Sequence, residues 1–393
     1  MLMTSTDRSD MNVPWLEPSE EQRILCDRVL KLADTLNQGM LRRDQEAILD
    51  REVWRRCAEF GIPGLPVPQG FGGGGHDLLT TLLVMKTLGY SCQDNGLVFS
   101  MNAQMWAVEL PILHFGSDEQ KRYYLPRLCS GEFIGAHAIS EPEHGSDVMG
   151  MATRAVRDGD DYILNGHKSY VTSGPICDLC LIFATLDPEM KAAGVTAFLV
   201  DRGTAGMRAS PALPKMGLRT AQMGEITLQD CRVPWTHRLG GEGAGLAIFN
   251  SAMEWERTCI FASHLGAMQR LLEQTVKFAK ARRQFGSPIS KYSSIADKIV
   301  DMKIAIEAGE LLLYKAAAMK ASGKNAVLNA AIAKLFVSEA HVRQALDAMQ
   351  IHGAYGFLVE NEVERELRDA VPGTIYSGTS EMQRKIIARL MGL

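Results

Sequence analysis

The chain has 393 residues, of which 46% are hydrophobic and 22% charged, a balance typical of a soluble globular protein with two or three domains. Lysine and arginine number 42 against 46 aspartates and glutamates, so the formal net charge is −4. This charge excludes the basic surface expected of a protein that binds nucleic acid or an acidic membrane surface.

The start of the chain, "MLMTSTDRSDMNVPW", has neither the apolar core of a secretion signal nor the arginine-rich composition of a transit peptide. No apolar run in the sequence approaches the length of a membrane span. We therefore expect a cytoplasmic protein that has no membrane partner and no nucleic-acid partner.

Residues 1–133 are expected to form an α-helical domain. Segments such as "EEQRILCDRVLKLADTL" and "AQMWAVELPILHF" carry apolar residues at three-to-four spacing, and Ser117 and Gln120 have the spacing of a helix-capping box. The run "GFGGGG" at residues 70–75 matches the GxGxxG pattern of dinucleotide-binding sites, but no βαβ pattern surrounds it. A flexible glycine loop is therefore favoured over a Rossmann site.

In residues 134–242 the hydrophobic period changes to two, which predicts a β-domain. "TRAVRDGDDYILNG" predicts a hairpin, and "DLCLIFATL", "VTAFLVDR" and "GEITLQDCRVP" predict further strands. Cys177 and Cys180 form a CxxC in one of these segments, without the second pair that a zinc site needs. Buried strand cysteines in a reducing compartment are favoured over a redox or metal motif, and we expect no metal site.

In residues 243–393 long helical patterns return, which predicts a C-terminal helix bundle. We expect "FNSAMEWERTCIFASHLGAMQRLLEQTVKFAKAR" to form one helix and "SSIADKIVDMKIAIEAGELLLYKAAAMKA" another. The fold class is therefore α+β, with helices first, then a β-domain, then a bundle.

Several segments combine glycine, hydroxyl and aromatic residues in a way that could hold a polar ligand. "AHAISEPEHGSD" and "NGHKSYVTSG" each run from a strand into a turn, and their presence in one β-domain favours a ligand site over two plain turns. "ARRQFGSPI" fits a helix end capped by Gly286 and a pyrophosphate contact through arginine equally well. "QIHGAYGF" and "IYSGTSEMQR" predict loops between bundle helices, with His352 expected to serve packing.

The segment "AMEWERTC" at residues 252–259 places two glutamates on a predicted helix. Residues two apart on a helix point in different directions, so Glu254 and Glu256 cannot share a face. The helical neighbours of Glu256 are apolar: Phe249, Ala252, Met253, Cys259 and Ile260. An unpaired carboxylate is costly in such surroundings, and burial should raise its pKa towards neutrality.

Taken in order, "AISEPEHGSD", "NGHKSYVTSG", "GEITLQDCRVP", "EWER", "RRQFG", "QIHGAYGF" and "YSGTSEMQRKIIAR" resemble the acyl-CoA dehydrogenase flavoprotein family across essentially the whole chain. The resemblance implies an N-terminal helical domain, a central β-domain and a C-terminal four-helix bundle, with FAD between the β-domain and the bundle. It also implies an oxidoreductase that acts on acyl thioesters, and a homotetramer in which the adenine half of FAD reaches a neighbouring subunit.

The resemblance carries FAD and substrate contacts onto particular positions of this chain. The first FAD segment gives His137, Ile139, Ser140 and Ser146, and the second gives Tyr170 and Thr172, whose hydroxyl is expected near flavin N5. The FAD contacts from the bundle are Arg282, Gln284 and Phe285, which reach an adjacent subunit's FAD, and Gln350, Gly353, Thr379 and Glu381. The substrate contacts are Ser146, Arg257, Tyr376 and Gly378.

The catalytic base is the main departure from the family pattern. Many members carry a glutamate base in a "YEGT" loop, where this chain has "YSGT" with Ser377. A branch resembling the isovaleryl-type enzymes takes its base from the bundle helix, immediately before the arginine, and that position is Glu256. The resemblance thus implies that Glu256 removes the α proton while the β hydrogen leaves as hydride to flavin N5. The backbone N–H of Ser377 would stabilise the thioester oxygen; a structural Glu256 paired with an arginine is the alternative.

Smaller departures concern the FAD contacts and the substrate. Tyr170 replaces a usual tryptophan, and Ser293 and Glu381 replace usual glutamines, which leaves details of FAD binding open. "MEWERTC", "YSGT" and "IIARLMGL" also resemble dehydrogenases that act on acyl or aminoacyl groups tethered to carrier proteins, such as prolyl-carrier dehydrogenases.

The sequence leaves the thioester carrier, the electron acceptor and two rival functions open. The substrate is either an acyl-CoA or an acyl-carrier-protein thioester, and the acceptor is either an electron-transfer flavoprotein or oxygen. A flavin monooxygenase or oxidase is one rival function, and a non-catalytic scaffold, which would be colourless, is the other.

Overall fold

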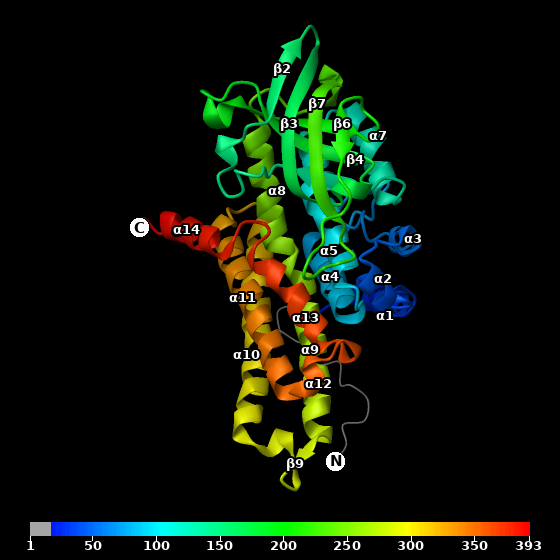
Figure 1. Cartoon of the computed structure of the whole chain (residues 1–393), viewed down its shortest axis with the longest axis vertical. Helices are drawn as coiled ribbons and strands as arrows, with labels where there is room; N and C mark the ends of the chain where they lie inside the picture. The colour runs from blue at the N-terminus through cyan, green and yellow to red at the C-terminus, as the bar shows by residue number, and fades with distance from the viewer. Residues whose placement is uncertain (1–16) are drawn as a thin grey trace.

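The computed structural model describes residues 17–393, and it places a β-sheet at one end of an elongated molecule and a helix bundle at the other (Figure 1). The start of the chain, which we expect to carry no targeting signal, lies outside the described residues. Within residues 17–393, no helix is both long and apolar enough to cross a membrane.

The N-terminal third is helical, as predicted. The helices are α1 (Glu20–Leu36), α2 (Met40–Glu46), α3 (Arg51–Phe60), α4 (Leu78–Ser91), α5 (Asn95–Gln104), α6 (Leu110–Phe115) and α7 (Asp118–Cys129). Ser117 and Gln120 form the predicted capping box at the start of α7. The glycine run holds only the short 3₁₀ turn Gln69–Phe71 and follows no strand, so the prediction of a glycine loop is confirmed.

The middle of the chain forms one mixed sheet. Its strands are β1 (Gly135–Ala138), β2 (Arg154–Asp158), β3 (Asp161–Thr172), β4 (Leu179–Thr185), β5 (Val195–Asp201), β6 (Met207–Ala209), β7 (Met223–Val233) and β8 (Arg238–Leu239). The order is β6-β7-β3-β2-β4-β5-β8, and β1 pairs with β4 in parallel. Asp158 faces Asp161 across the predicted hairpin.

Cys177 and Cys180 are buried free thiols. Among the described residues, no group of three or more His, Cys, Asp or Glu side chains is placed to hold a metal ion.

The C-terminal part is a helix bundle, so the predicted α+β class with a terminal bundle is confirmed (Figure 1). Its elements are α8 (Gly245–Cys259), α9 (Phe261–Ala281), β9 (Arg283–Gln284), β10 (Ser287–Pro288), α10 (Ser293–Ala321), α11 (Val327–His352), α12 (Ala354–Phe357), α13 (Val363–Ala370) and α14 (Ser380–Leu390).

Three local predictions about the bundle are wrong. The single helix expected over residues 249–282 is divided at Ile260 into α8 and α9. Gly286 does not cap α9, which ends at Ala281; it lies with Phe285 in the turn of the small β9–β10 hairpin. "QIHGAYGF" is mostly helical, because α11 continues to His352 before the chain turns at Gly353.

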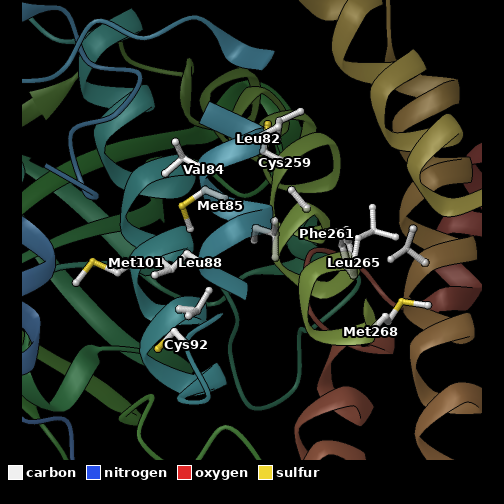
Figure 2. Close-up of a cluster of buried hydrophobic side chains, with 14 of the residues drawn as sticks. Leu82, Val84, Met85, Leu88, Cys92, Met101, Cys259, Phe261, Leu265 and Met268 are labelled. Carbon is white, nitrogen blue, oxygen red and sulfur yellow. The ribbon is translucent and has the colours of Figure 1, made fainter. Parts of the chain in front are cut away.

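A shared hydrophobic core joins the N-terminal helices to the bundle. Helices α4 and α9 cross closely at two glycines, Gly89 on α4 and Gly266 on α9. A Cβ added at Gly89 would stand 2.1 Å from the Ser263 carbonyl oxygen, and a Cβ added at Gly266 would stand 2.0 Å from the Lys86 carbonyl oxygen. This crossing fixes α9, and with it the adjoining α8, against the first domain. Figure 2 shows the cluster around the crossing, including Leu82, Met85, Leu88, Phe261, Leu265 and Met268.

Candidate active site

Glu256 lies in the last turn of α8 and is only 8% exposed. Glu254 points elsewhere and forms an ion pair with Lys320 on α10 at 2.8 Å. The Lys320 ammonium also lies 4.0 Å from the centre of the Trp255 ring. The predicted difference between the two glutamates is therefore confirmed: one is paired, and the other is buried without a cationic partner at hydrogen-bond distance.

Ser377 supplies the hydrogen bond that Glu256 receives. Its hydroxyl donates to Glu256 Oε2 at 2.6 Å, from the loop between residues 375 and 379. No donor among residues 17–393 reaches Oε1 of the same carboxylate. The sequence pointed to the backbone N–H of Ser377, and this side-chain contact was not foreseen.

The main chain of the Ser377 loop is held by two side chains, the half-buried Arg257 and the buried Gln383. Arg257 Nε donates to the Ser377 carbonyl at 2.9 Å, and Gln383 Nε2 donates to the Ser377 and Gly378 carbonyls at 3.2 and 2.8 Å. Ser377 has a φ of 53°, a left-handed conformation that is costly for a residue with a Cβ and needs such support. Arg257, predicted to contact substrate, here holds the loop, and no sequence signal singled out Gln383.

The electrostatics of this site favour a carboxylate that can exchange a proton near neutral pH. Burial raises the pKa of Glu256 to about 7, against the lowering effects of the Ser377 hydroxyl and the Arg257 charge. Tyr376, beside Ser377, packs its ring against Phe99 at 4.5 Å and against Phe261 at 5.9 Å. A base with a pKa near the working pH is the arrangement that general-base catalysis needs.

The structure brings the two predicted FAD segments of the β-domain together. The Ser169 N–H donates to the Ser140 carbonyl at 2.9 Å, which joins β3 to the loop after β1. A buried ion pair between Lys168 and Glu141 at 2.8 Å holds the same junction. The other predicted positions here are the buried Ile139, the half-buried His137 and Thr172, and the exposed Ser146 and Tyr170.

The remaining predicted FAD positions lie elsewhere. Arg282, Gln284 and Phe285 are at the hairpin at the far tip of the bundle (Figure 1). Near this hairpin, His352 stacks on Phe278 at 4.2 Å, so the neighbouring Gln350 and Gly353 belong to the same end of the molecule. Thr379 and Glu381 begin α14, where the Thr379 hydroxyl accepts from the Met382 N–H at 3.3 Å. A single chain therefore does not unite all the predicted FAD contacts.

The β-domain segments fit a large ligand that is both aromatic and polar. Tyr170 is 63% exposed with a φ of 57°, so its backbone is strained while its ring faces solvent. His137 Nε2 and Ser169 Oγ are buried and have no hydrogen-bond partner among the described residues. Burial lowers the pKa of His137 to about 4, so its imidazole is neutral. These groups suit the ring and hydroxyl groups of FAD.

Comparison with known proteins decides the family. Residues 19–132, 136–231 and 243–392 match the N-terminal, middle and C-terminal domains of acyl-CoA dehydrogenase. The chain belongs to the acyl-CoA dehydrogenase family. The resemblance read from the motifs is thus confirmed, and with it the FAD cofactor and the class of FAD-dependent oxidoreductase acting on acyl thioesters.

The chain is similar to an L-prolyl-[peptidyl-carrier protein] dehydrogenase of Pseudomonas fluorescens, with 45% identity over 341 residues, or 86% of this chain and 90% of that protein. It is also similar to the crystal structure of the prolyl acyl carrier protein oxidase AnaB, with 47% identity and a TM-score of 0.94 over 96% of this chain and all of that one. A structure of PigA with FAD and proline matches at 37% identity and a TM-score of 0.94, over 96% of this chain and 99% of that chain.

Proposed function

We propose that this protein introduces an α,β double bond into an acyl or aminoacyl group carried as a thioester on a carrier protein, with Glu256 as the base. The observation that carries the assignment of the base is the buried Glu256 carboxylate beneath a loop whose own side chain, Ser377, cannot act as one. Similarity to two proteins named for prolyl groups on carrier proteins supports the carrier-bound substrate. An acyl-CoA thioester is the second candidate, and the family supports it.

The proposed reaction breaks two C–H bonds and forms one C=C bond. The α proton passes to Glu256, whose Oε1 receives no hydrogen bond from residues 17–393, while the β hydrogen leaves with its electron pair. FAD, when bound, accepts that hydride at its flavin ring. Because Ser377 engages Oε2, the carboxylate is held in one orientation while Oε1 takes the proton.

The negative charge that develops on the thioester oxygen needs a fixed hydrogen-bond donor. We assign this role to the Ser377 N–H, because Arg257 and Gln383 hold the backbone of the same residue in its left-handed conformation. A preorganised donor of this kind contributes about 3 kcal/mol to transition-state stabilisation.

The test is an anaerobic titration of the FAD-loaded protein, followed by flavin absorbance, with prolyl and acyl carrier proteins and with matching CoA esters. Bleaching by the carrier-bound thioesters alone supports the proposal, and bleaching by CoA esters alone supports the second candidate. Glu256→Gln should keep its bound FAD and lose about a thousandfold in bleaching rate. Undiminished bleaching in this variant would rule out Glu256 as the base.

The melting temperature of Glu256→Gln shows whether a loss of bleaching comes from misfolding. The pKa of Glu256 is raised from its ordinary 4.5 to about 7, so the wild type loses stability as pH rises from 4.5 through 7 and keeps that loss above 7. Glutamine stays neutral and can still accept from Ser377. At pH 8 the variant should therefore melt no lower than the wild type, so a loss of bleaching reports on chemistry.

We also propose a homotetramer, and an electron-transfer flavoprotein or oxygen as the electron acceptor. Separation of the predicted FAD contacts between the β-domain and the far tip of the bundle supports an assembly in which a second subunit completes the site. Peroxide formed during turnover in air would identify oxygen as the acceptor, and hydroxylated product would instead favour the monooxygenase reading.

A further inference from the structure

Behind the Ser377 loop, two histidines from different bundle helices form a hydrogen-bonded chain with Tyr376. The Tyr376 hydroxyl contacts Nε2 of His264 on α9, and His264 Nδ1 lies 2.9 Å from Nδ1 of His341 on α11. Neither histidine belongs to the FAD or substrate positions described above.

The donor and the acceptor in each of these two hydrogen bonds can be assigned from the chemistry of the three side chains. Burial and the nearby Glu256 carboxylate raise the pKa of Tyr376 well above its ordinary value, so its hydroxyl keeps its proton. Among the described residues His264 Nε2 is the one hydrogen-bond partner of this hydroxyl, so we assign Tyr376 as the donor and His264 Nε2 as the acceptor. His264 then carries its proton on Nδ1 and donates it to His341 Nδ1, since a neutral imidazole has one donor and one acceptor. The proton of His341 therefore lies on Nε2.

The surroundings keep both histidines neutral. Burial lowers the pKa of His341 to about 4 and that of His264 well below its ordinary value. The charged groups that face the pair are Lys334 towards His264, and Arg270 and Glu366 towards His341. The cations oppose protonation of the pair, and Glu366 is itself held by Arg270 at 2.9 Å.

Packing around the pair shows that the space is shaped for an imidazole. A Cβ at Gly373 would stand 2.9 Å from His264 Cε1, and the Phe261 ring lies 4.8 Å from that of His264. His341 Nε2 is buried without a partner among the described residues. His341 and Asp369 also line a cavity of about 20 Å³, which has room for about one water.

The hydrogen-bonded chain of His341, His264 and Tyr376 ends next to Ser377, the residue that donates to the proposed base, Glu256. Arg257 and Gln383 hold the Ser377 main chain, and the Tyr376 side chain anchors the preceding residue of the loop. We propose that His264 and His341 are positioning residues, which hold Tyr376 and thereby set the Ser377 hydroxyl against Glu256. This inference rests on the proposed role of Glu256.

The main test compares His264→Phe, His264→Gln and Tyr376→Phe as FAD-loaded enzymes. His264→Phe removes the acceptor for the Tyr376 hydroxyl, so kcat should fall about tenfold while KM and flavin content stay unchanged. The acidic limb of the kcat/KM profile should move to higher pH, because a weakened Ser377 contact raises the pKa of Glu256. His264→Gln, whose side-chain oxygen can accept the same bond, should recover much of the loss.

Tyr376→Phe deletes one oxygen atom and keeps the test decisive if His264→Phe fails to fold. The two changes should be non-additive, so the double variant should be no slower than the worse single variant. Tyr162→Phe is the matched control: its hydroxyl donates to Glu242 at 2.5 Å inside the β-domain, and its loss should leave kcat and the pH profile unchanged.

The result that would overturn the inference is a loss of melting temperature in His264→Phe and Tyr376→Phe with a wild-type kcat per flavin and an unchanged pH profile. Glu256→Gln is measured beside them to separate the two claims. If that variant still bleaches, the proposed base fails. If it is inactive while the histidine and tyrosine variants behave as wild type, only the positioning role fails.

Discussion

Among single residues, Ser377 has the clearest measurable effect, because its hydroxyl is the contact that most lowers the pKa of the buried Glu256. Removing it in Ser377→Ala should raise the apparent pKa of the base by about one unit, the worth of one hydrogen bond to a charged group. The active form is the carboxylate, so the variant should be slower at pH 6.5 and approach the wild-type rate at pH 9. The pH profile of kcat/KM measures this shift.

Ser380→Ala is a suitable control, because the Ser380 hydroxyl is buried in the same region without a hydrogen-bond partner among the described residues. Its removal should leave the profile in place. An acidic limb that does not move in Ser377→Ala would show that the hydroxyl does not tune the base.

The sequence predicted the side-chain direction of Glu256 because helical spacing alone decides which face a residue occupies. It could not predict that Arg257 and Gln383 hold the Ser377 main chain, or that His264 contacts Tyr376, because these partners come from helices or loops far away in the chain. The contact from Ser377 to Glu256 spans 121 residues. Spacing within one element carries no information about such a pairing.

At the scale of elements, the division of the expected long helix at Ile260 has a local cause. The Ile260 carbonyl accepts both the Ser263 N–H at 3.2 Å and the Ser263 hydroxyl at 2.7 Å, which replaces the regular helical pattern. The sequence there contains neither proline nor a glycine, so the apolar period continues across the break. The helix pattern predicted the helical content correctly and the division wrongly.

The crossing of α4 and α9 supports this divided helix, and Gly266→Ala should test it. The added Cβ would stand 2.0 Å from the Lys86 carbonyl oxygen, so the helices must separate. We expect a loss of about 3 kcal/mol in the free energy of unfolding, measured by urea denaturation. Gly70→Ala is the control, since a Cβ there meets no atom within 4 Å. Equal stability of the two variants would contradict the close crossing.

At the scale of the whole molecule, the change of hydrophobic period along the chain predicted the order of helices, sheet and bundle. The boundaries at residues 133 and 242 remain predictions, with β1 to β8 lying between them. Periodicity reports how each element is buried, but it does not report how copies of the chain meet. That information lies in the apolar groups that a single chain leaves on its surface.

Helix α10 carries such groups on one side: Val300, Ile304 and Leu311 are spaced by four and seven residues and are exposed. Phe285, at the tip of the bundle, is 97% exposed. If the proposed tetramer covers these groups, Ile304→Glu should yield smaller assemblies, because burying an unpaired charge at an interface is costly. Light scattering coupled to size-exclusion chromatography measures the mass, and flavin absorbance measures the retained FAD.

Ile24→Glu introduces the same charge at a similarly exposed isoleucine, 52% against 59% for Ile304, on helix α1. It should leave the mass unchanged, because α1 belongs to the N-terminal helices and lies away from the bundle tip marked by β9 (Figure 1). Loss of FAD together with loss of mass in Ile304→Glu would show that a second subunit completes the cofactor site. A wild-type protein that runs as a monomer with full FAD would contradict the assembly and require one chain to hold the cofactor alone.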